Sequence, residues 1–178
     1  VRLQEIVATG DKGKCILNMV RGAKIICKAL YDQGRIHGVI SIGGAQGTEI
    51  GCSAMRSLPV GVPRLMVSTV ASGQATFGPY VGTKDITMMH SVADMQGLNF
   101  LTKRILENAA GAICGMIEDF EENSIRPEGI PVALSMLGTT TLGALRCKKI
   151  LEERGFEVVT FHQNGTGGIA MEEMIRSR

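Results

Sequence analysis

The sequence is poor in aromatic residues and nearly neutral in net charge. Tryptophan is absent, aromatic residues make up 4% of the 178 positions, and the formal net charge is +2 at pH 7. Proteins that bind nucleic acid usually present a clustered basic surface, and those that hold single strands also stack bases on aromatic side chains. Because the sequence has little of either feature, we expect no nucleic-acid partner.

Paired cysteines and long apolar runs are also missing. No two of the five cysteines are separated by only two residues, and most of their neighbours are apolar; they are Cys15, Cys27, Cys52, Cys114 and Cys147. This pattern is typical of free buried thiols in a reducing compartment, so we expect a cytoplasmic protein. No apolar run reaches the roughly 20 residues that a membrane-spanning helix needs, and we expect no membrane partner.

The rest of the composition is that of an ordinary globular protein, with 44% hydrophobic and 20% charged residues. The chain opens at Val1 rather than at a methionine, and it reaches Arg178 within a helical pattern. We therefore expect an incomplete fragment of a larger protein, which lacks N- and C-terminal segments of its subdomains.

Glycine is abundant, with 23 residues, and its most informative cluster follows an apolar, β-branched run at residues 37–42. This order predicts a strand, a loop with Gly43, Gly44 and Gly47, and then a helix. Backbone N–H groups of such a loop and of the first helical turn point at one spot, which attracts an anion, most often a phosphate. Thr48 is placed to cap the helix or to give its hydroxyl to the phosphate. The alternative is a tight strand-to-helix turn that binds nothing.

This glycine loop matches no standard nucleotide-binding fingerprint. A Walker loop requires a lysine after its last glycine, whereas Thr48 follows Gly47 here. A helix N-terminus contributes roughly 0.3–1 kcal/mol to anion binding, and micromolar affinity needs about 8 kcal/mol. Other donors must therefore converge on the same site.

A second polar loop follows the buried strand that we predict at residues 64–69. It supplies hydroxyl groups and a glycine from Ser68, Thr69, Ser72 and Gly73. The carboxyl ends of parallel strands open on the same side of a sheet, which is where ligands bind. We therefore expect the two loops to form one cleft.

Two aspartates are candidate ligands for a metal ion that accompanies a phosphate. We expect Asp85 to reach the cleft and, with Asp94, to hold Mg²⁺ through water, because this ion takes few protein carboxylates and borrows phosphate oxygens. Alternatively, Asp85 only caps a turn. His90 lies between the two aspartates in the sequence, and its role stays open.

Helical periodicity is clearest in two stretches of the first part of the chain. Apolar residues recur on one face from Cys15 to Gly34, and again from Gly97 to Phe120. The other elements that we expect are an edge strand and a loop at residues 1–14, a helix at about 49–57, a turn at 78–84 and a strand at 85–90.

Residues 123–129 indicate a linker, which separates a first part, 1–122, from a second part, 130–178. In the second part we predict strands at 130–135 and 157–161, a helix up to Arg154 and another from about Ile169. Strand, polar loop and helix recur with short connections, so we predict an α/β protein with two Rossmann-like parallel-sheet subdomains. The first part is then the C-terminal portion of one subdomain, and the second part is the N-terminal portion of the other.

The polar loops of the second part form a second candidate anion site. It comprises Gly138, Thr139, Thr140, Gly165, Thr166, Gly167 and Gly168. The threonines are most simply helix caps, unless another anion-binding element lies opposite them. His162 stands at a strand end beside these glycines and is a candidate acid–base group, although a lone histidine is more often structural.

Five motifs resemble the corresponding stretches of one family, in the same order. They are Ile42-Gly-Gly-Ala-Gln-Gly-Thr48, Leu58-Pro-Val-Gly-Val-Pro63, Val67-Ser-Thr-Val-Ala-Ser-Gly73, Tyr80-Val-Gly-Thr-Lys-Asp-Ile86 and Phe161-His-Gln-Asn-Gly-Thr-Gly-Gly-Ile-Ala-Met-Glu172. From about Ile36 onward, the chain resembles the ATP-binding N-terminal domain of the tomato mosaic virus resistance protein and its microbial relatives.

This resemblance implies a two-subdomain α/β domain that binds ATP with Mg²⁺. In the plant member the domain binds and blocks a viral replication protein, and the microbial members have no settled reaction. Ala45 and Gln46 stand where the family usually has Ser-Gly, so Gln46 places a side chain beside the expected phosphates.

We therefore expect a nucleotide- or phosphate-binding domain of a larger protein. Two alternatives stay open: a protein–protein interaction domain with structural glycine loops, or an enzyme that acts on a phosphorylated or carboxylated metabolite. We also expect a homo-oligomer, because the helix predicted at 98–120 has small residues where a second helix could approach: Ala109, Ala110, Gly111, Ala112 and Gly115.

Overall fold

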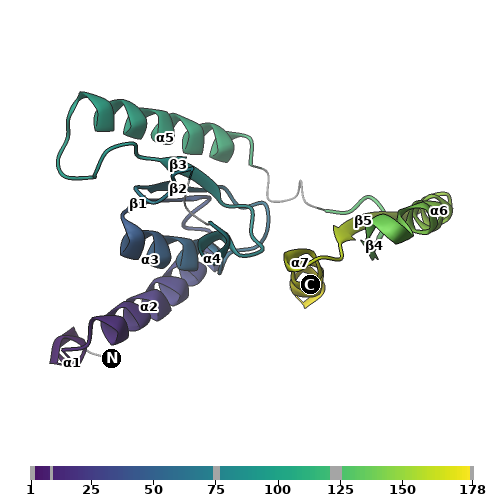
Figure 1. Ribbon diagram of the computed structural model, residues 1–178, viewed down its shortest axis with the longest axis horizontal. Coiled ribbons are helices and arrows are strands. Elements are labelled where there is room, and N and C mark those ends of the chain that lie inside the picture. The colour runs from purple at the N-terminus through teal and green to yellow at the C-terminus, as the bar shows by residue number, and fades with distance from the viewer. Residues whose placement is uncertain (1–2, 9, 74–76, 121–125, 177–178) are drawn as a thin grey trace. The chain divides into compact units, whose positions relative to one another are not determined.

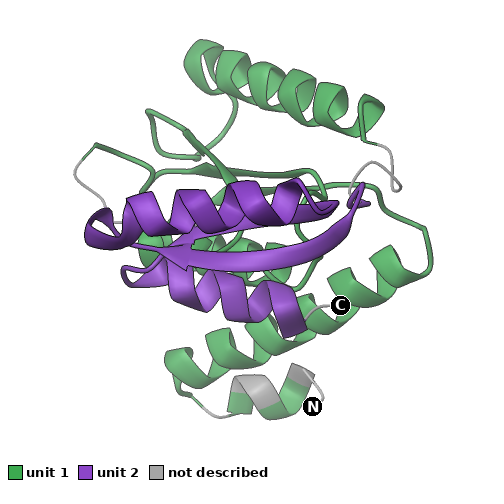
Figure 2. Ribbon diagram, turned by 90° about the vertical axis from the view of Figure 1, so that its right-hand side faces the viewer, with its two compact units in different colours: residues 1–120 green, residues 121–178 purple. Residues whose placement is uncertain are grey.

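The computed structural model describes residues 3–8, 10–73, 77–120 and 126–176. The chain divides into two compact units, unit 1 (residues 1–120) and unit 2 (residues 121–178), which are coloured separately in Figure 2. Each unit contains its own parallel sheet. The predicted α/β class with two parallel-sheet subdomains is confirmed.

The sheet of unit 1 has three parallel strands in the order β1 (Val39–Gly43), β2 (Arg64–Ser68) and β3 (Thr87–His90). All five residues of the central strand β2 are buried, as expected for a strand of a parallel sheet that is covered on both faces. Because all three strands run in the same direction, their carboxyl ends form one edge of the sheet.

Helices cover both faces of this sheet. In Figure 1, α5 (Phe100–Glu118) lies on one face, and α3 (Ala45–Met55) lies on the other. Side chains alternate between the two faces along a strand. The α5 side is packed by Leu65, Val67, Ile105, Ala109 and Ile113. The α3 side is packed by Cys52, Met55, Met66 and Ile86.

The N-terminal segment is helical, so the edge strand expected within residues 1–14 is wrong. It forms α1 (Leu3–Ala8) and the start of α2 (Lys12–Asp32). The Asp11 side chain caps α2 by accepting a hydrogen bond from the backbone N–H of Lys14 at 3.1 Å. The cap starts the helix three residues before Cys15, where the apolar periodicity begins.

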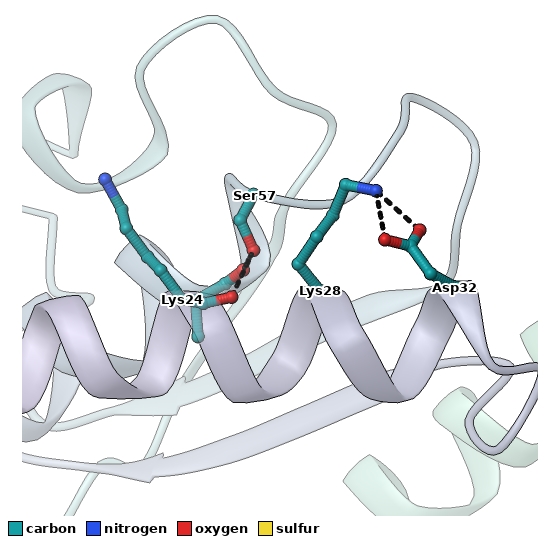
Figure 3. A network of polar contacts seen from close by, with 5 residues as sticks. Lys24, Lys28, Asp32 and Ser57 are labelled. Atoms are coloured by element: carbon teal, nitrogen blue, oxygen red, sulfur yellow. Dashed lines mark hydrogen bonds and ion pairs between the residues drawn. The ribbon is translucent and has the colours of Figure 1, made fainter.

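Helix α2 packs on α3. Figure 3 shows the polar contacts along this helix. The hydroxyl of Ser57, just beyond α3, donates to the carbonyl oxygen of Lys24 at 3.4 Å, and Lys28 pairs with Asp32 at 2.7 Å one turn apart. The first contact ties the two helices together, whereas the second is an exposed pair within α2.

Two further helices of unit 1 differ from the expectation. Residues 78–81 form a short helix, α4 (Gly78–Val81), where a turn was expected. Helix α5 is capped by Asn99, whose side chain accepts from the N–H groups of Leu101 and Thr102 at 3.0 Å each. Because α5 begins after this cap, Leu98 stays exposed, and the buried stripe consists of Thr102, Ile105, Ala109 and Ile113.

Unit 2 contains two parallel strands, β4 (Ile130–Met136) and β5 (Phe156–His162). The short 3₁₀ helix η1 (Gly138–Thr140) leads into α6 (Thr141–Glu152), and α7 (Thr166–Arg176) follows β5. Figure 2 shows these two long helices on opposite sides of the strand pair. No helix in the described residues of either unit is long and apolar enough to cross a membrane.

Candidate functional site

The carboxyl edge of the unit 1 sheet brings the first two predicted loops together. Gly43, Ser68 and His90 end the three strands and are paired in register across the sheet. The backbone N–H of Thr69 donates to the carbonyl oxygen of Gly43 at 3.2 Å. The loops after β1 and β2 therefore touch each other, as the parallel arrangement predicted.

The loop after β1 passes directly into α3. Gly44 is the N-cap, and the first helical hydrogen bond runs from the N–H of Thr48 to the Gly44 carbonyl oxygen at 2.7 Å. The N–H groups of residues 45–47 precede that bond and have no acceptor within the helix. The positive end of the helix dipole thus lies beside Gly44, with the side chain of Gln46 exposed there.

Close approach of the backbone requires a glycine at position 43 but not at position 44. A Cβ on Gly43 would lie 2.9 Å from the Cα of Gly47, a distance that real Cβ atoms do not show. A Cβ on Gly44 would lie 3.4 Å from Oγ1 of Thr69, in ordinary contact with the second loop. The first glycine permits the tight turn, and the second keeps the space between the loops open.

Thr48 does not have the role expected of it. Its side chain is fully buried, and its hydroxyl lies 2.6 Å from the hydroxyl of Ser68, which is also fully buried. The helix begins four residues earlier than a Thr48 cap would require, so Thr48 turns inward toward β2. Thr48 and Ser68 therefore fasten the two loops together and do not face a ligand.

The rest of the second loop stays at the same edge. The hydroxyl oxygen of Ser68 accepts from the N–H of Val70 at 3.2 Å, and the Ala71 N–H donates to the Ser68 carbonyl oxygen at 3.4 Å. Thr69 and Ser72 are half-buried and Gly73 is exposed. These three residues remain candidates for ligand contact.

Asp85 lies at the opposite edge of the sheet, so its predicted place in the cleft is wrong. It precedes β3, and its carboxylate accepts from the Gly61 N–H and from the guanidinium of Arg64, both at 2.9 Å. Arg64 begins β2 and is fully buried, and this burial lowers its pKa while Asp85 opposes the shift. Asp85 thus serves as the counter-ion that makes a buried arginine tolerable.

Asp94 lies beyond the carboxyl end of β3, on the same edge as the two loops. It is exposed, and its carboxylate accepts from the neighbouring Met95 N–H at 2.8 Å. Among the described residues, no three histidine, cysteine or acidic side chains gather to hold a metal ion. Of the two predicted Mg²⁺ ligands, Asp94 is therefore the one that remains at this edge.

His90, whose role the sequence left open, also lies at this edge. It pairs with Ser68 in the same row that places Gly43 beside the second loop. Periodicity around residue 90 is weak, and the strand β3 contains only four residues. Its position follows only when the register of β3 against β2 is known.

The candidate loops of unit 2 also share one edge, because Met136 and His162 are paired at the ends of β4 and β5. Thr140 accepts from the Leu137 N–H at 3.1 Å, and Thr141 donates to the Leu137 carbonyl oxygen at 3.0 Å, so both hydroxyls serve the helix start. An open depression of about 560 Å³ is lined by Leu134, Ser135, Thr139, Thr140, Gly143, Ala144 and Gln163.

Two of the three predicted glycines after β5 lie in a helix, whereas Gly165 lies in the turn before it. Helix α7 begins at Thr166, three residues before the predicted start, so Gly167 and Gly168 belong to its first turn. A Cβ on Gly167 would overlap the His162 carbonyl oxygen, which explains the glycine. The exposed His162 ring accepts at Nδ1 from the Asn164 N–H at 3.2 Å, so this nitrogen is occupied by its own loop.

Comparison with known proteins agrees with this two-unit arrangement. The N-terminal domain of the uncharacterised protein family UPF0261 matches residues 2–122 of the chain, and the C-terminal domain of the same family matches residues 130–178. The chain belongs to this family. The predicted resemblance is thereby confirmed, and it extends further toward the N-terminus than Ile36.

Relatives of the chain occur in bacteria and in a plant. A UPF0261 protein of Clostridium tetani is 43% identical over 98% of the chain, and one of Mesorhizobium japonicum is 42% identical over 97%. The tomato ToMV resistance protein Tm-1(GCR237) is 38% identical over 93% of the chain. The chain spans 43%, 41% and 22% of the lengths of these three proteins, respectively.

Proposed function

We propose that unit 1 binds the phosphate groups of a nucleotide, ATP with Mg²⁺, at the carboxyl edge of its sheet. The observation that carries the proposal is the contact between the loops after β1 and β2 beside the first turn of α3. Free N–H groups at a helix start, next to a glycine that leaves room for close approach, form a suitable anion cradle.

The fastening of the two loops supports binding as well as stability. A single helix start contributes too little for micromolar affinity, so donors from another segment must already be in place. The buried pair of Thr48 and Ser68 holds the second loop next to the first before any ligand arrives. A site that is ordered in advance loses less conformational entropy on binding.

Mg²⁺ fits this edge only if the phosphate oxygens of the nucleotide supply most of its contacts. Asp94 would contact it through water, and the phosphate oxygens would supply the remaining direct contacts. Asp85 is unsuited, because Arg64 and the Gly61 N–H already occupy both of its carboxylate oxygens. Bound Mg²⁺ would neutralise phosphate charge, and no reaction is implied.

A protein partner is the second candidate function. Three large apolar side chains are strongly exposed from the end of β3 to the first residue of α5, namely Val92, Leu98 and Phe100, the last with 89% of its surface accessible. Exposed apolar side chains close together on one segment favour contact with another protein. The enzyme alternative with His162, and the second anion site in unit 2, stay predictions.

Isothermal titration calorimetry on the full-length protein tests the nucleotide proposal. We expect Mg-ATP to bind, and Gly44→Ala to weaken binding about tenfold or more, because its methyl group fills the space between the two loops. Gly111→Ala is the matched control, since a Cβ at this exposed position of α5 meets nothing within 4 Å. Equal affinities of the two variants would place the ligand elsewhere.

A further inference from the structure

We propose that His90 donates an imidazole N–H to a phosphate oxygen of the ligand bound at the carboxyl edge of unit 1. This inference rests on the proposed function and adds a named contact to it. It follows from strand register, side-chain direction, burial and the shape of the backbone after β3.

Strand register places His90 in the row of residues that closes the sheet at this edge. Ser68 is the partner of His90 on one side and of Gly43 on the other. The three residues therefore span the sheet beneath the two loops. His90 extends the row from the glycine loop, past the fastened hydroxyl pair, to the third strand.

Side-chain alternation directs His90 to the face that α3 covers. Met66 and Met88 pack with Cys52 and Met55 of α3. Ser68 and His90 lie two residues further along their strands, so their side chains point to that same face. The hydrogen bond between the hydroxyls of Ser68 and Thr48 of α3 agrees with this direction. The first turn of α3 and the imidazole of His90 thus share one face and one edge.

The ring nitrogens of His90 are available for hydrogen bonds to a ligand. His90 is half-buried, and within the described part of the chain it forms no hydrogen bond or ion pair. A ring that is partly withdrawn from water gains by finding a polar partner. The other two histidines differ, since His37 precedes β1 at the amino edge and His162 is held by its own loop.

The backbone after His90 is held firmly. The N–H of the fully buried Ser91 donates to the Ser68 carbonyl oxygen at 3.1 Å, and its hydroxyl donates to the Ala93 carbonyl oxygen at 2.7 Å. Val92 then adopts φ = 62°, a left-handed conformation that is strained for a β-branched residue. This turn fixes the end of β3, and with it the position of the imidazole.

Titration calorimetry on the full-length protein tests the contact, with His90→Leu as the variant, because leucine has no donor, and His37→Leu as the matched control. We expect Mg-ATP to bind His90→Leu about tenfold or more weakly than the wild-type protein. The control should bind as the wild-type protein does. Adenosine, which has no phosphate, should bind the wild-type protein and His90→Leu equally weakly.

A second measurement separates contact from a structural effect and does not depend on the variant's folding. The imidazole resonances of His90 in the wild-type protein should shift on titration with Mg-ATP or inorganic phosphate, and should stay in place with adenosine. Unmoved resonances, or unchanged ATP affinity of a folded His90→Leu, overturn the contact and leave the proposed function standing. No binding of ATP to the wild-type protein overturns both.

Discussion

At the residue scale, the pair formed by Thr48 and Ser68 decides how the glycine loop is used. The two hydroxyls lie 2.6 Å apart in a place that water does not reach. A buried hydroxyl that loses its partner costs more than an exposed one, because water cannot replace the bond. The pair therefore contributes to stability directly, and to binding only by keeping the two loops in place.

Replacing Thr48 by valine tests this role. Thr48→Val keeps the side-chain volume and removes the hydroxyl, and we expect the free energy of unfolding to fall by about 1–3 kcal/mol. Thr48→Ser retains the hydroxyl and should lower the free energy of unfolding clearly less. Urea unfolding of both variants provides the comparison, and a Thr48→Val protein as stable as the wild type would show that the pair is not needed.

A second residue-scale effect concerns Cys52, which is fully buried on α3. Burial raises the pKa of its thiol from 9.0 to about 11, with Arg56 opposing the shift. Because the pKa is higher in the folded state, the stabilisation is complete below pH 9.0. It is lost as the pH rises toward 11, since the unfolded thiol ionises first.

We therefore expect the wild-type protein to lose more stability than Cys52→Ala when the pH is raised from 9 to 11. The difference should amount to at most about 1.4 kcal/mol for each pH unit. Urea unfolding at a series of pH values measures it, and each protein serves as its own reference at pH 8. If the free energies of unfolding of the two proteins fell equally with rising pH, the raised pKa of Cys52 would be refuted.

At the element scale, α3 connects most parts of the candidate site. Its first turn faces the glycine loop, Thr48 bonds to the end of β2, and Arg56 donates to the carbonyl oxygens of Pro79 and Tyr80 at 2.6 Å each. Arg56 thereby ties α3 to α4, the helix that follows the second loop. One helix thus holds the second loop on both sides.

The order of most strands and loops could be predicted from the sequence, because β1, β2, β4 and β5 are followed by clusters of glycine and polar residues. The direction of parallel strands then predicted that the loops after β1 and β2 meet. The starts of helices were harder to place. Since α3 begins after Gly44 rather than near residue 49, Thr48 faces inward, which a cap assignment at Thr48 could not anticipate.

Asp85 and His90 illustrate a second limit, which is the assignment of residues to the two edges of a sheet. Both belong to the segment of β3, but Asp85 precedes the strand and His90 ends it. They therefore lie at opposite edges. The sequence predicted one strand over residues 85–90, which includes both side chains, and only the observed start of β3 at Thr87 and its register with β2 separate the two roles.

At the scale of the whole molecule, the chain consists of two α/β units that repeat one theme, a parallel sheet with polar loops at its carboxyl edge. The predicted homo-oligomer stays a prediction. Ala110, Gly111 and Ala112 are exposed on α5, whereas Ala109 packs against β2 within the unit. The small residues on the outer face of α5 are thus free of intramolecular packing among the described residues.

A crystal structure of the full-length protein with Mg-ATP tests the central claim most directly. The account predicts phosphate oxygens within about 2.7–3.2 Å of the backbone nitrogens of Ala45, Gln46 or Gly47. It also predicts the triphosphate between the loops that follow β1 and β2. A triphosphate bound at the loops of unit 2, or at the edge of the unit 1 sheet where Asp85 lies, would contradict it.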